Sequence, residues 1–235
     1  MKSKCLFVAL LLLLTNYDAV AQNLKNNQEL KISALLSREN TVLLLVDHQV
    51  GLLSGVRDYN TAELTHNIVA LAKAAKVLGI PVIITAVDSN GLWGPTLPEL
   101  VATLPNVSII KRTSINAWDD ANVVKAVKAT GRKQLLVAGI SLEVCASMPA
   151  ISAKEAGYDS RVVIDASGTF NESKRIAGMQ RLNTLGIQVT DYATAAVEML
   201  KDNADPLSGA LYNAIDLSFS NIVYELSEAT KKSIK

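Results

Sequence analysis

The sequence predicts an α/β protein of three layers (αβα), in which a six-stranded parallel sheet lies between two layers of helices. Three observations predict this class. Short apolar runs of strand length alternate with longer segments of helical periodicity. The apolar runs contain few polar positions, as expected of strands buried on both faces. Glycines follow several of the helical segments, where they end helices. We expect a doubly wound sheet of the Rossmann-like order 3-2-1-4-5-6.

The first strand and the first long helix are the clearest elements. Residues 41–47 read TVLLLVD, a continuous apolar run that ends in a charge. Asn60 and Glu63 are suited to the N-cap and N3 positions of a helix that ends at Gly79. The apolar face of this helix consists of Leu64, Ile68, Leu71, Ala75 and Leu78.

The same alternation continues to residue 200, and an amphipathic tail follows it. Further strands are expected at 81–86, 108–111, 134–139, 160–165 and 187–190. Further helices are expected at 97–104, 119–130, 142–156, 172–185 and 193–200. The tail has an apolar stripe that either wraps the domain or packs on a second subunit, and we favour the subunit contact. The stripe consists of Leu207, Leu211, Ile215, Phe219, Ile222 and Leu226.

The N-terminus has the features of an export signal. Lys2 and Lys4 precede an apolar run at 5–14, and Ala19-Val20-Ala21 offers the small residues that signal peptidase requires. This run is too short to span a bilayer core of about 30 Å, although an uncleaved anchor is the alternative. We expect a signal peptide at 1–21, an extension at 22–37, the α/β domain at 38–205 and a helical tail at 206–235. The mature protein would then be periplasmic or secreted, without a membrane segment.

Composition excludes several classes of function. There are 23 Lys and Arg against 22 Asp and Glu without a basic cluster, so we expect no nucleic-acid partner. The chain is 49% hydrophobic and 19% charged, which excludes disorder. His48 and His66 are its 2 histidines, too few for a multi-histidine metal site. If Cys5 leaves with the signal peptide, Cys145 is a solitary thiol that is either a buried apolar residue or a reactive group.

Three reactive residues fall where strands are expected to end. Asp47 ends the first strand, Lys111 ends the third, and Cys145 lies just past the fourth, at the start of a helix. Ligands bind at this edge of an open parallel sheet. Each residue alone has an ordinary explanation as a loop cap, a surface lysine or a core cysteine. Their coincidence on one edge favours a catalytic site.

These residue types suit acyl transfer by a cysteine. A helix N-terminus and a nearby ammonium group both lower the pKa of a thiol, so we expect both effects on Cys145. Asp47 is placed to accept the thiol proton, with Lys111 holding its carboxylate ionised and in orientation. Neither histidine is needed as a base.

Three segments resemble the isochorismatase-like cysteine hydrolases, especially a metal-free octameric bacterial branch. They read TVLLLVDHQVGLL, IIKRTSINAWDD and LLVAGISLEVCASMPAISAKEAGYDSRVVIDASGTFNE. The similarity covers about residues 38–226. It implies that Asp47 is the general base, Lys111 the site lysine and Cys145 the nucleophile. It also implies a cis peptide between Ile140 and Ser141, with the N–H groups of Ser141 and Cys145 forming the oxyanion hole.

The resemblance also bears on cofactors and partners. Metal-binding relatives use an aspartate and histidines after the second strand, whereas this loop has Asp88 and no histidine. We therefore expect no metal and no other cofactor, and we interpret Asp88 as a loop cap. Leu142 stands where the family commonly has threonine. The implied partners are a small-molecule substrate and further copies of the chain, in an octamer.

Four residues are candidates for substrate contact, although the aromatic ones could equally pack a loop or a subunit interface. They are Gln49, Asn116, Trp118 and Phe170. We predict a cysteine-dependent hydrolase that cleaves a small amide-type C–N bond through an acyl-enzyme on Cys145. Two alternatives remain, an exported redox or scavenging protein with a reactive thiol, and a catalytically silent scaffold of the same fold.

Overall fold

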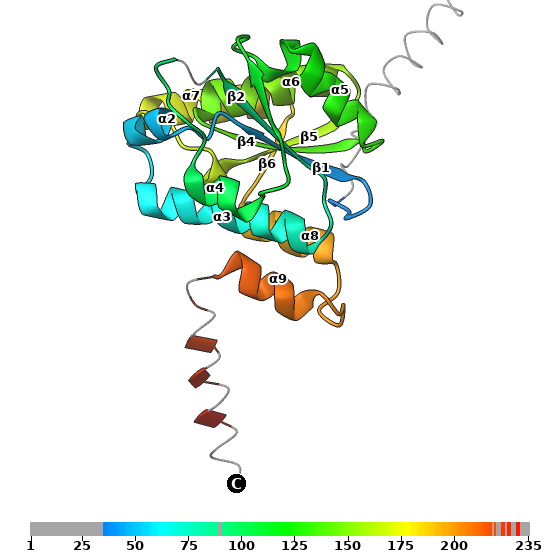
Figure 1. The fold of residues 1–235 in the computed structure, drawn as a ribbon. Coiled ribbons are helices and arrows are strands. Elements are labelled where there is room, and N and C mark those ends of the chain that lie inside the picture. Colours follow the sequence, from blue (N-terminus) through cyan, green and yellow to red (C-terminus); the bar gives the residue numbers. More distant parts are fainter. Residues whose placement is uncertain are drawn as a thin grey trace, which may run out of the picture. The chain divides into compact units, whose positions relative to one another are not determined.

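The computed structural model describes residues 35–88, 91–217, 219, 222–223, 225–226 and 229–230. Its six strands form one sheet in the order β3-β2-β1-β4-β5-β6, with parallel pairing throughout (Figure 1). The predicted fold class and strand order are confirmed. The strands are β1 (Thr41–Val46), β2 (Val82–Val87), β3 (Ile109–Arg112), β4 (Gln134–Gly139), β5 (Asp159–Val163) and β6 (Gln188–Thr190).

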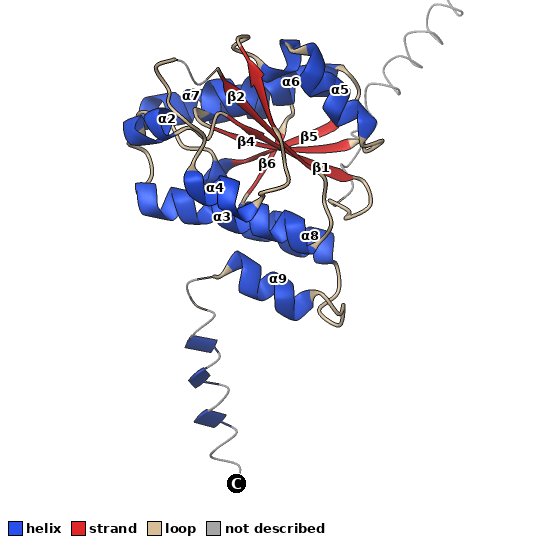
Figure 2. Cartoon of the chain, viewed as in Figure 1, coloured by secondary structure: helices blue, strands red, loops and turns tan. Residues whose placement is uncertain are grey.

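Helices cover both faces of this sheet, as Figure 2 shows. One face carries α3 (Thr61–Val77), α4 (Pro98–Thr103) and α8 (Tyr192–Leu200). The other face carries α5 (Ala121–Ala129), α6 (Ser147–Glu155) and α7 (Glu172–Thr184). The short elements are α2 (Val50–Gly55), η1 (Ala117–Asp119), η2 (Leu142–Ala146), η3 (Ile164–Ala166) and α9 (Ser208–Ile215).

Strand periodicity divides the core into two clusters, one on each face of the sheet. In β1, Leu43 and Leu45 face the helices α3 and α8, whereas Leu44 and Val46 face α5 and α6. Every residue of β1 is fully buried, which explains its unbroken apolar sequence. The same alternation holds at the end of β3, where neighbouring side chains point to opposite faces, and this decides the composition of the site described below.

The helix ends follow the predicted capping chemistry. The Asn60 side chain accepts hydrogen bonds from the N–H groups of Ala62 and Glu63, and α3 is followed by Gly79 at φ +66°. The helix expected at 142–156 is divided, because η2 is a single π-helical turn that precedes α6. The sequence did not predict α2, whose six residues VGLLSG include two glycines and are too short to show periodicity.

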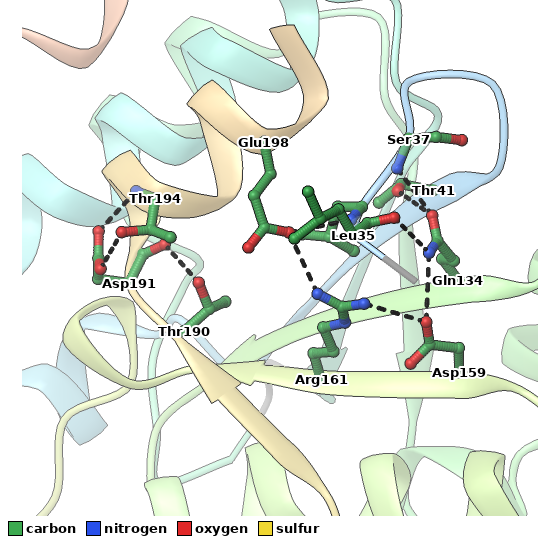
Figure 3. Close-up of polar contacts among 11 residues, drawn as sticks. Leu35, Ser37, Thr41, Gln134, Asp159, Arg161, Thr190, Asp191, Thr194 and Glu198 are labelled. Atoms are coloured by element: carbon green, nitrogen blue, oxygen red, sulfur yellow. Dashed lines mark hydrogen bonds and ion pairs between the residues drawn. The ribbon is translucent and has the colours of Figure 1, made fainter. Parts of the chain in front are cut away.

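A partly buried polar network lies at the opposite edge of the sheet, where the strands begin (Figure 3). The Arg161 guanidinium is 3.2 Å from both the Glu198 and the Asp159 carboxylates, which ties β5 to α8. Gln134 donates to Asp159 and to the carbonyl oxygen of Leu35, at 3.2 and 3.1 Å. The network therefore anchors the start of the described chain to β4 and α8.

The predicted terminal segments are only partly described. The signal peptide and residues 22–34 of the extension lie outside the described residues. In the tail, Leu211 and Ile215 of α9 are buried in the cluster with α3 and α8, so this part of the tail wraps the domain. No helix in the part of the chain that the structure describes is long and apolar enough to cross a membrane.

The Asp165 carboxyl in η3 should make stability depend on pH. Its Oδ1 accepts from the Tyr192 N–H at 2.9 Å, and burial raises its pKa from 3.8 to about 6. The folded state therefore holds this proton more tightly than the unfolded chain. The resulting stabilisation is complete below the unfolded pKa of 3.8 and is lost as the pH rises through about 6.

We therefore expect Asp165→Asn, which keeps the acceptor oxygen but does not titrate, to lose less unfolding free energy between about pH 4 and about pH 7 than the unmodified protein. Urea unfolding at both pH values measures this difference. The substitution Asp202→Asn, at an exposed position, is the control. Equal pH dependence in the Asp165→Asn variant and the unmodified protein would contradict the assignment.

Candidate active site

Asp47 is a buried carboxylate held from two sides. It follows β1 with a backbone φ of +56°, an uncommon conformation that aspartate tolerates better than most residues, and it is 1% exposed. Its Oδ1 accepts from the Val87 N–H at 3.0 Å, and its Oδ2 is 2.5 Å from Nη2 of Arg112. The ends of β1, β2 and β3 therefore meet at this carboxylate.

The cation beside Asp47 is Arg112, which the sequence analysis did not identify. Arg112 is 3% exposed, and its guanidinium also donates to the carbonyl oxygens of Ser114 and Ile115. The prediction that Lys111 holds Asp47 is wrong. Its side chain is 62% exposed, with Nζ 3.7 Å from Asp88 Oδ1. Adjacent strand residues point to opposite faces, so only one of the two cations can reach Asp47.

Cys145 lies in η2, with its thiol near enough to the Asp47 carboxylate for that charge to act on the pKa of the thiol. It is partly exposed and forms no disulfide with the rest of the described chain. Burial and the Asp47 charge raise the pKa of the thiol well above its usual value, against a smaller lowering effect of Arg112. This is the reverse of the expected lowering by a helix N-terminus and a lysine. Cys145 lies before the first residue of α6, so the N-terminus of that helix does not lower the pKa of the thiol. The thiol therefore keeps its proton in the resting protein.

Burial also raises the pKa of Asp47, because desolvation outweighs the opposing effects of Arg112 and the hydrogen bonds. The two groups thus form a buried acid pair beside a fixed positive charge. Such a pair is suited to the transfer of one proton from the Cys145 sulfur to the Asp47 carboxylate. The positive charge of Arg112 stabilises the single negative charge that the pair carries.

Of the two N–H groups expected to form the oxyanion hole, only one is free to donate to a substrate in this conformation. The Ile140–Ser141 peptide bond is cis, as the resemblance implied. The Cys145 N–H donates to the Ser141 carbonyl oxygen at 2.8 Å. Among the described residues, the Ser141 N–H has no acceptor. An incoming carbonyl oxygen would therefore meet one free donor and one that is shared.

The turn that carries Cys145 is fixed by contacts the sequence analysis missed. The Leu142 N–H donates to Gly168 O at 3.0 Å, and Thr169 Oγ1 donates to Glu143 Oε2 at 2.7 Å. Leu142, in the position where threonine is common, is fully buried against Gly178 of α7. No local sequence signal pairs Thr169 with Glu143, because the contact joins distant loops.

The predicted substrate contacts have structural partners. Asn116 caps η1 and donates to Asp119 and to Ser152, each at 3.1 Å. Trp118 packs edge to face on Tyr158, with ring centroids 5.3 Å apart. Phe170 packs against the core beside Gly55. Contact between these residues and a substrate stays a prediction.

Gln49 and the two titratable residues near the site, His48 and Asp88, also have defined places. Gln49 holds the loop after β2 by donating to Val87 O and Gly94 O, at 3.2 and 2.6 Å. His48 contacts the Ala166 carbonyl oxygen through Nε2, and burial lowers its pKa to about 4, so it is neutral near pH 7. Asp88, interpreted as a loop cap, is paired with Lys111.

The described residues contain no group of three or more His, Cys, Asp or Glu side chains that could hold a metal. The expectation of a metal-free site remains a prediction.

Comparison with known proteins assigns this chain to a family. The isochorismatase domain model matches residues 41–194, so the chain belongs to the isochorismatase family of hydrolases. It is 42% identical over 200 residues to the probable hydrolase YcaC of Escherichia coli, covering 84% of this chain and 96% of that protein. The resemblance stated from the sequence is therefore confirmed.

Two solved structures agree with this assignment. One is the E. coli ycaC gene product, an octameric hydrolase of unknown specificity, with a TM-score of 0.79 and 40% identity over 83% of this chain and 98% of that one. The other is YcaC from Pseudomonas aeruginosa with hexane-2,5-diol and covalent acrylamide. It has a TM-score of 0.77 and 39% identity, over 82% of this chain and 97% of that one.

The different environments of Arg112 and Lys111 lead to a stability prediction. We expect Arg112→Met to lower the free energy of unfolding by about 3 kcal/mol, because it leaves the Asp47 carboxylate buried without its cation. Lys111→Met should cost less than about 0.5 kcal/mol, since an exposed ion pair contributes little. Urea unfolding of both variants measures the difference.

The double variant Arg112→Met, Asp47→Asn serves as the control for this prediction, because it should recover part of the loss by removing the uncompensated charge. Equal losses for the two single variants would show that the cation beside Asp47 has been misassigned.

Proposed function

We propose that this protein is a cysteine-dependent hydrolase that cleaves a C–N bond of a small amide through an acyl-enzyme on Cys145. One observation carries the proposal: at the carboxyl edge of the sheet, the buried Asp47 carboxylate is paired with Arg112 at 2.5 Å and is near enough to Cys145 for its charge to raise the pKa of the thiol. This edge is where ligands bind in open parallel sheets.

The proposed first half-reaction transfers the acyl group to sulfur. Asp47 takes the proton of the Cys145 thiol as sulfur attacks the amide carbonyl carbon. Negative charge develops on the carbonyl oxygen, which the Ser141 N–H stabilises, joined by the Cys145 N–H if it turns from the Ser141 carbonyl oxygen. Asp47 then gives its proton to the leaving nitrogen as the C–N bond breaks, and a thioester remains on Cys145.

The proposed second half-reaction releases the acid. Asp47, again ionised, takes a proton from a water molecule that attacks the thioester carbonyl carbon. The C–S bond breaks, and the proton returns to sulfur. Arg112 does not exchange protons in either step, because a guanidinium stays charged in proteins. Its role is to keep Asp47 oriented and to limit the cost of the buried negative charge.

The relative from Pseudomonas aeruginosa supports a nucleophilic site in this fold. That protein carries covalent acrylamide. Acrylamide is an electrophile that combines with thiolates, and Cys145 is a free cysteine at the centre of the site proposed here. Fold likeness alone does not select the amide, so we limit the proposed substrate to the class of small carboxamides and related C–N compounds.

The Asp47→Asn variant distinguishes this hydrolase from a redox or scavenging thiol protein. Amide turnover should fall by about 10²- to 10⁴-fold, because the base is lost. Oxidation of Cys145 by peroxide should accelerate, because removing the Asp47 charge removes one cause of the raised thiol pKa. Turnover of a carboxamide panel and intact-mass detection of sulfenic acid measure the two rates.

The control for this experiment is Cys145→Ala, which should abolish both turnover and the acyl adduct while the thermal unfolding temperature stays close to that of the unmodified protein. Full carboxamide turnover in Cys145→Ala would end the proposal. A protein that is inactive on the whole panel in its unmodified form, with no adduct, would favour the silent scaffold instead.

We further propose that the chain acts as a homo-oligomer, an octamer as in the E. coli relative, after export to the periplasm or the medium. Supporting this assembly, the tail beyond α9 has four large apolar side chains at helical spacing, each 56–63% exposed. They are Phe219, Ile222, Val223 and Leu226. Exposed apolar patches of this kind mark interfaces, and a second copy of the chain is the occupant we propose.

The double variant Ile222→Glu, Leu226→Glu should therefore reduce the molar mass in solution, measured by size-exclusion chromatography with light scattering, while the α/β domain keeps its circular dichroism. The matched control is Glu225→Gln on the same exposed segment. An unchanged molar mass in the double variant would exclude the tail from the interface.

A further inference from the structure

The loop between η3 and α7 begins with a tightly packed segment, residues 167–169, that contacts both the η2 turn of Cys145 and the loop after α2. Thr169 is fully buried. Gly168 lies so close to α3 that a Cβ atom added to it would be 2.5 Å from Leu64 Cδ2. The segment therefore has no room to move toward α3.

One side of this segment binds the turn that carries Cys145. The Gly168 carbonyl oxygen accepts from the Leu142 N–H at 3.0 Å, and the Thr169 hydroxyl donates to Glu143 Oε2 at 2.7 Å. Leu142 and Glu143 are the first two residues of η2, and Cys145 is the fourth. The two hydrogen bonds therefore hold the start of the turn on which the thiol lies.

The other side of the segment binds a buried ion pair between Asp58 and Arg175. Asp58 Oδ1 accepts from the Thr169 N–H at 2.7 Å, and Asp58 Oδ2 is 2.7 Å from Nη1 of Arg175. The Asp58 side chain is fully buried, and that of Arg175 is 13% exposed. Arg175 also donates to the Ile164 carbonyl oxygen at 3.0 Å and lies 4.7 Å from the ring centroid of Tyr59. Because both charges have several partners, the pair is a firm anchor for Thr169.

The polar groups of Thr169 thus join the anchor to the turn. Its N–H binds Asp58, its carbonyl oxygen accepts from the Arg57 N–H at 2.9 Å, and its hydroxyl binds Glu143. A valine would fill nearly the same space and keep the two main-chain bonds. The hydroxyl is therefore the group whose loss loosens the turn without a change in the main chain.

We propose that Thr169 and Asp58 are positioning residues for the Cys145 thiol. Asp58 fixes the main chain of Thr169, and the Thr169 hydroxyl holds Glu143 and with it η2. The turn then keeps Cys145 beside Asp47, at the separation that proton transfer requires. A misplacement of about 1 Å is enough to lower an enzymatic rate by about 10²-fold. The effect on turnover rests on the proposed hydrolysis, whereas the position of the thiol is measurable without it.

The charges around the thiol make its position measurable. Burial and the charge of Asp47, which follows β1, raise the pKa of the Cys145 thiol, and Arg112 at the end of β3 opposes them. Glu143, the charged residue of η2 itself, is paired with Lys174 at 4.0 Å. If the turn moves away from Asp47, the pKa of the thiol should therefore fall toward its ordinary value. The same movement should slow turnover, because the base no longer reaches the sulfur.

The test uses the full chain and acrylamide as the probe of Cys145, with the adduct measured by intact mass. In Thr169→Val, acrylamide addition at pH 8 should be about threefold faster, because more of the thiol is ionised although a less basic thiolate is a weaker nucleophile. Turnover of the best substrate in the carboxamide panel should fall about tenfold in kcat. KM should change little, since the buried Thr169 offers no surface to a substrate.

Two matched variants separate position from stability. Thr169→Ser keeps the hydroxyl and should stay within about twofold of the unmodified protein in both rates. Thr41→Val removes the hydroxyl of a fully buried threonine at the opposite edge of the sheet, where it donates to Gln134 Oε1 at 3.2 Å. It should leave both rates unchanged while lowering the thermal unfolding temperature. Equal changes in Thr41→Val and Thr169→Val, or unmodified rates in Thr169→Val, would overturn the proposal.

Asp58→Asn tests the anchor behind Thr169. Asparagine keeps an acceptor for the Thr169 N–H but loses the charge that pairs with Arg175, so acrylamide addition should again accelerate. In the double variant with Thr169→Val, the acceleration should be smaller than the product of the two single effects, because both act through the contact with Glu143. An acceleration equal to that product would remove Asp58 from the proposal.

The acrylamide measurement separates this inference from the proposed hydrolysis. If the unmodified protein cleaves no carboxamide but Thr169→Val still accelerates acrylamide addition, the hydrolysis fails and the positioning of Cys145 stands. If the unmodified protein cleaves carboxamides and Thr169→Val changes neither rate, the hydrolysis stands and the positioning role is rejected.

Discussion

The buried ion pair between Asp47 and Arg112 is the interaction on which the site depends. Two opposite charges removed from water are costly unless each is well paired, and here each has several partners. Asp47 has the Val87 N–H in addition to the guanidinium, and the Cys145 thiol lies nearby. Arg112 has two backbone carbonyl oxygens. The pair therefore joins the ends of three strands and the turn of the cysteine into one unit.

In this arrangement the Cys145 thiol holds its proton, and the site does not present a thiolate to solvent. A cysteine with a lowered pKa reacts with many electrophiles and oxidants. Here burial and a neighbouring carboxylate raise the pKa of the thiol, so the sulfur stays protonated in the resting protein. In the reaction proposed above, Asp47 lies near Cys145 before any substrate binds, so activation of the thiol requires only a short proton transfer.

Most of the fold was accessible from the sequence because buried parallel strands have an unmistakable apolar pattern. The capping of α3 by Asn60 followed from local rules, and the strand order followed from the usual topology of sheets with alternating strands and helices. The choice between Lys111 and Arg112 did not, since the residues before them, Ile109 and Ile110, are both apolar and each faces one of two cores. With apolar side chains on both faces, periodicity shows where a strand ends but not which face its last residue meets.

The direction of the pKa shift of Cys145 could not be predicted from the sequence, for a related reason. Position at the start of a helix suggested a lowered value, but the residue lies in a π-helical turn, and its partners come from segments far away in the chain. The contact of Thr169 with Glu143 is of the same kind, joining the loop after β5 to the nucleophile turn. Sequence patterns specify elements well, whereas contacts between loops arise only after the sheet has brought the loops together.

The main chain of Val87 has an unusual position in this molecule. Its N–H binds the Asp47 carboxylate, and its carbonyl oxygen binds the Gln49 amide. Which substitutions residue 87 tolerates should therefore depend on whether these two main-chain bonds are kept. Exchange for isoleucine or threonine keeps both bonds, while proline, which has no N–H, would deprive the carboxylate of a partner. The main chain of a single residue thus links two neighbouring chemical environments, and a library that varies residue 87 would be depleted in proline before any other residue.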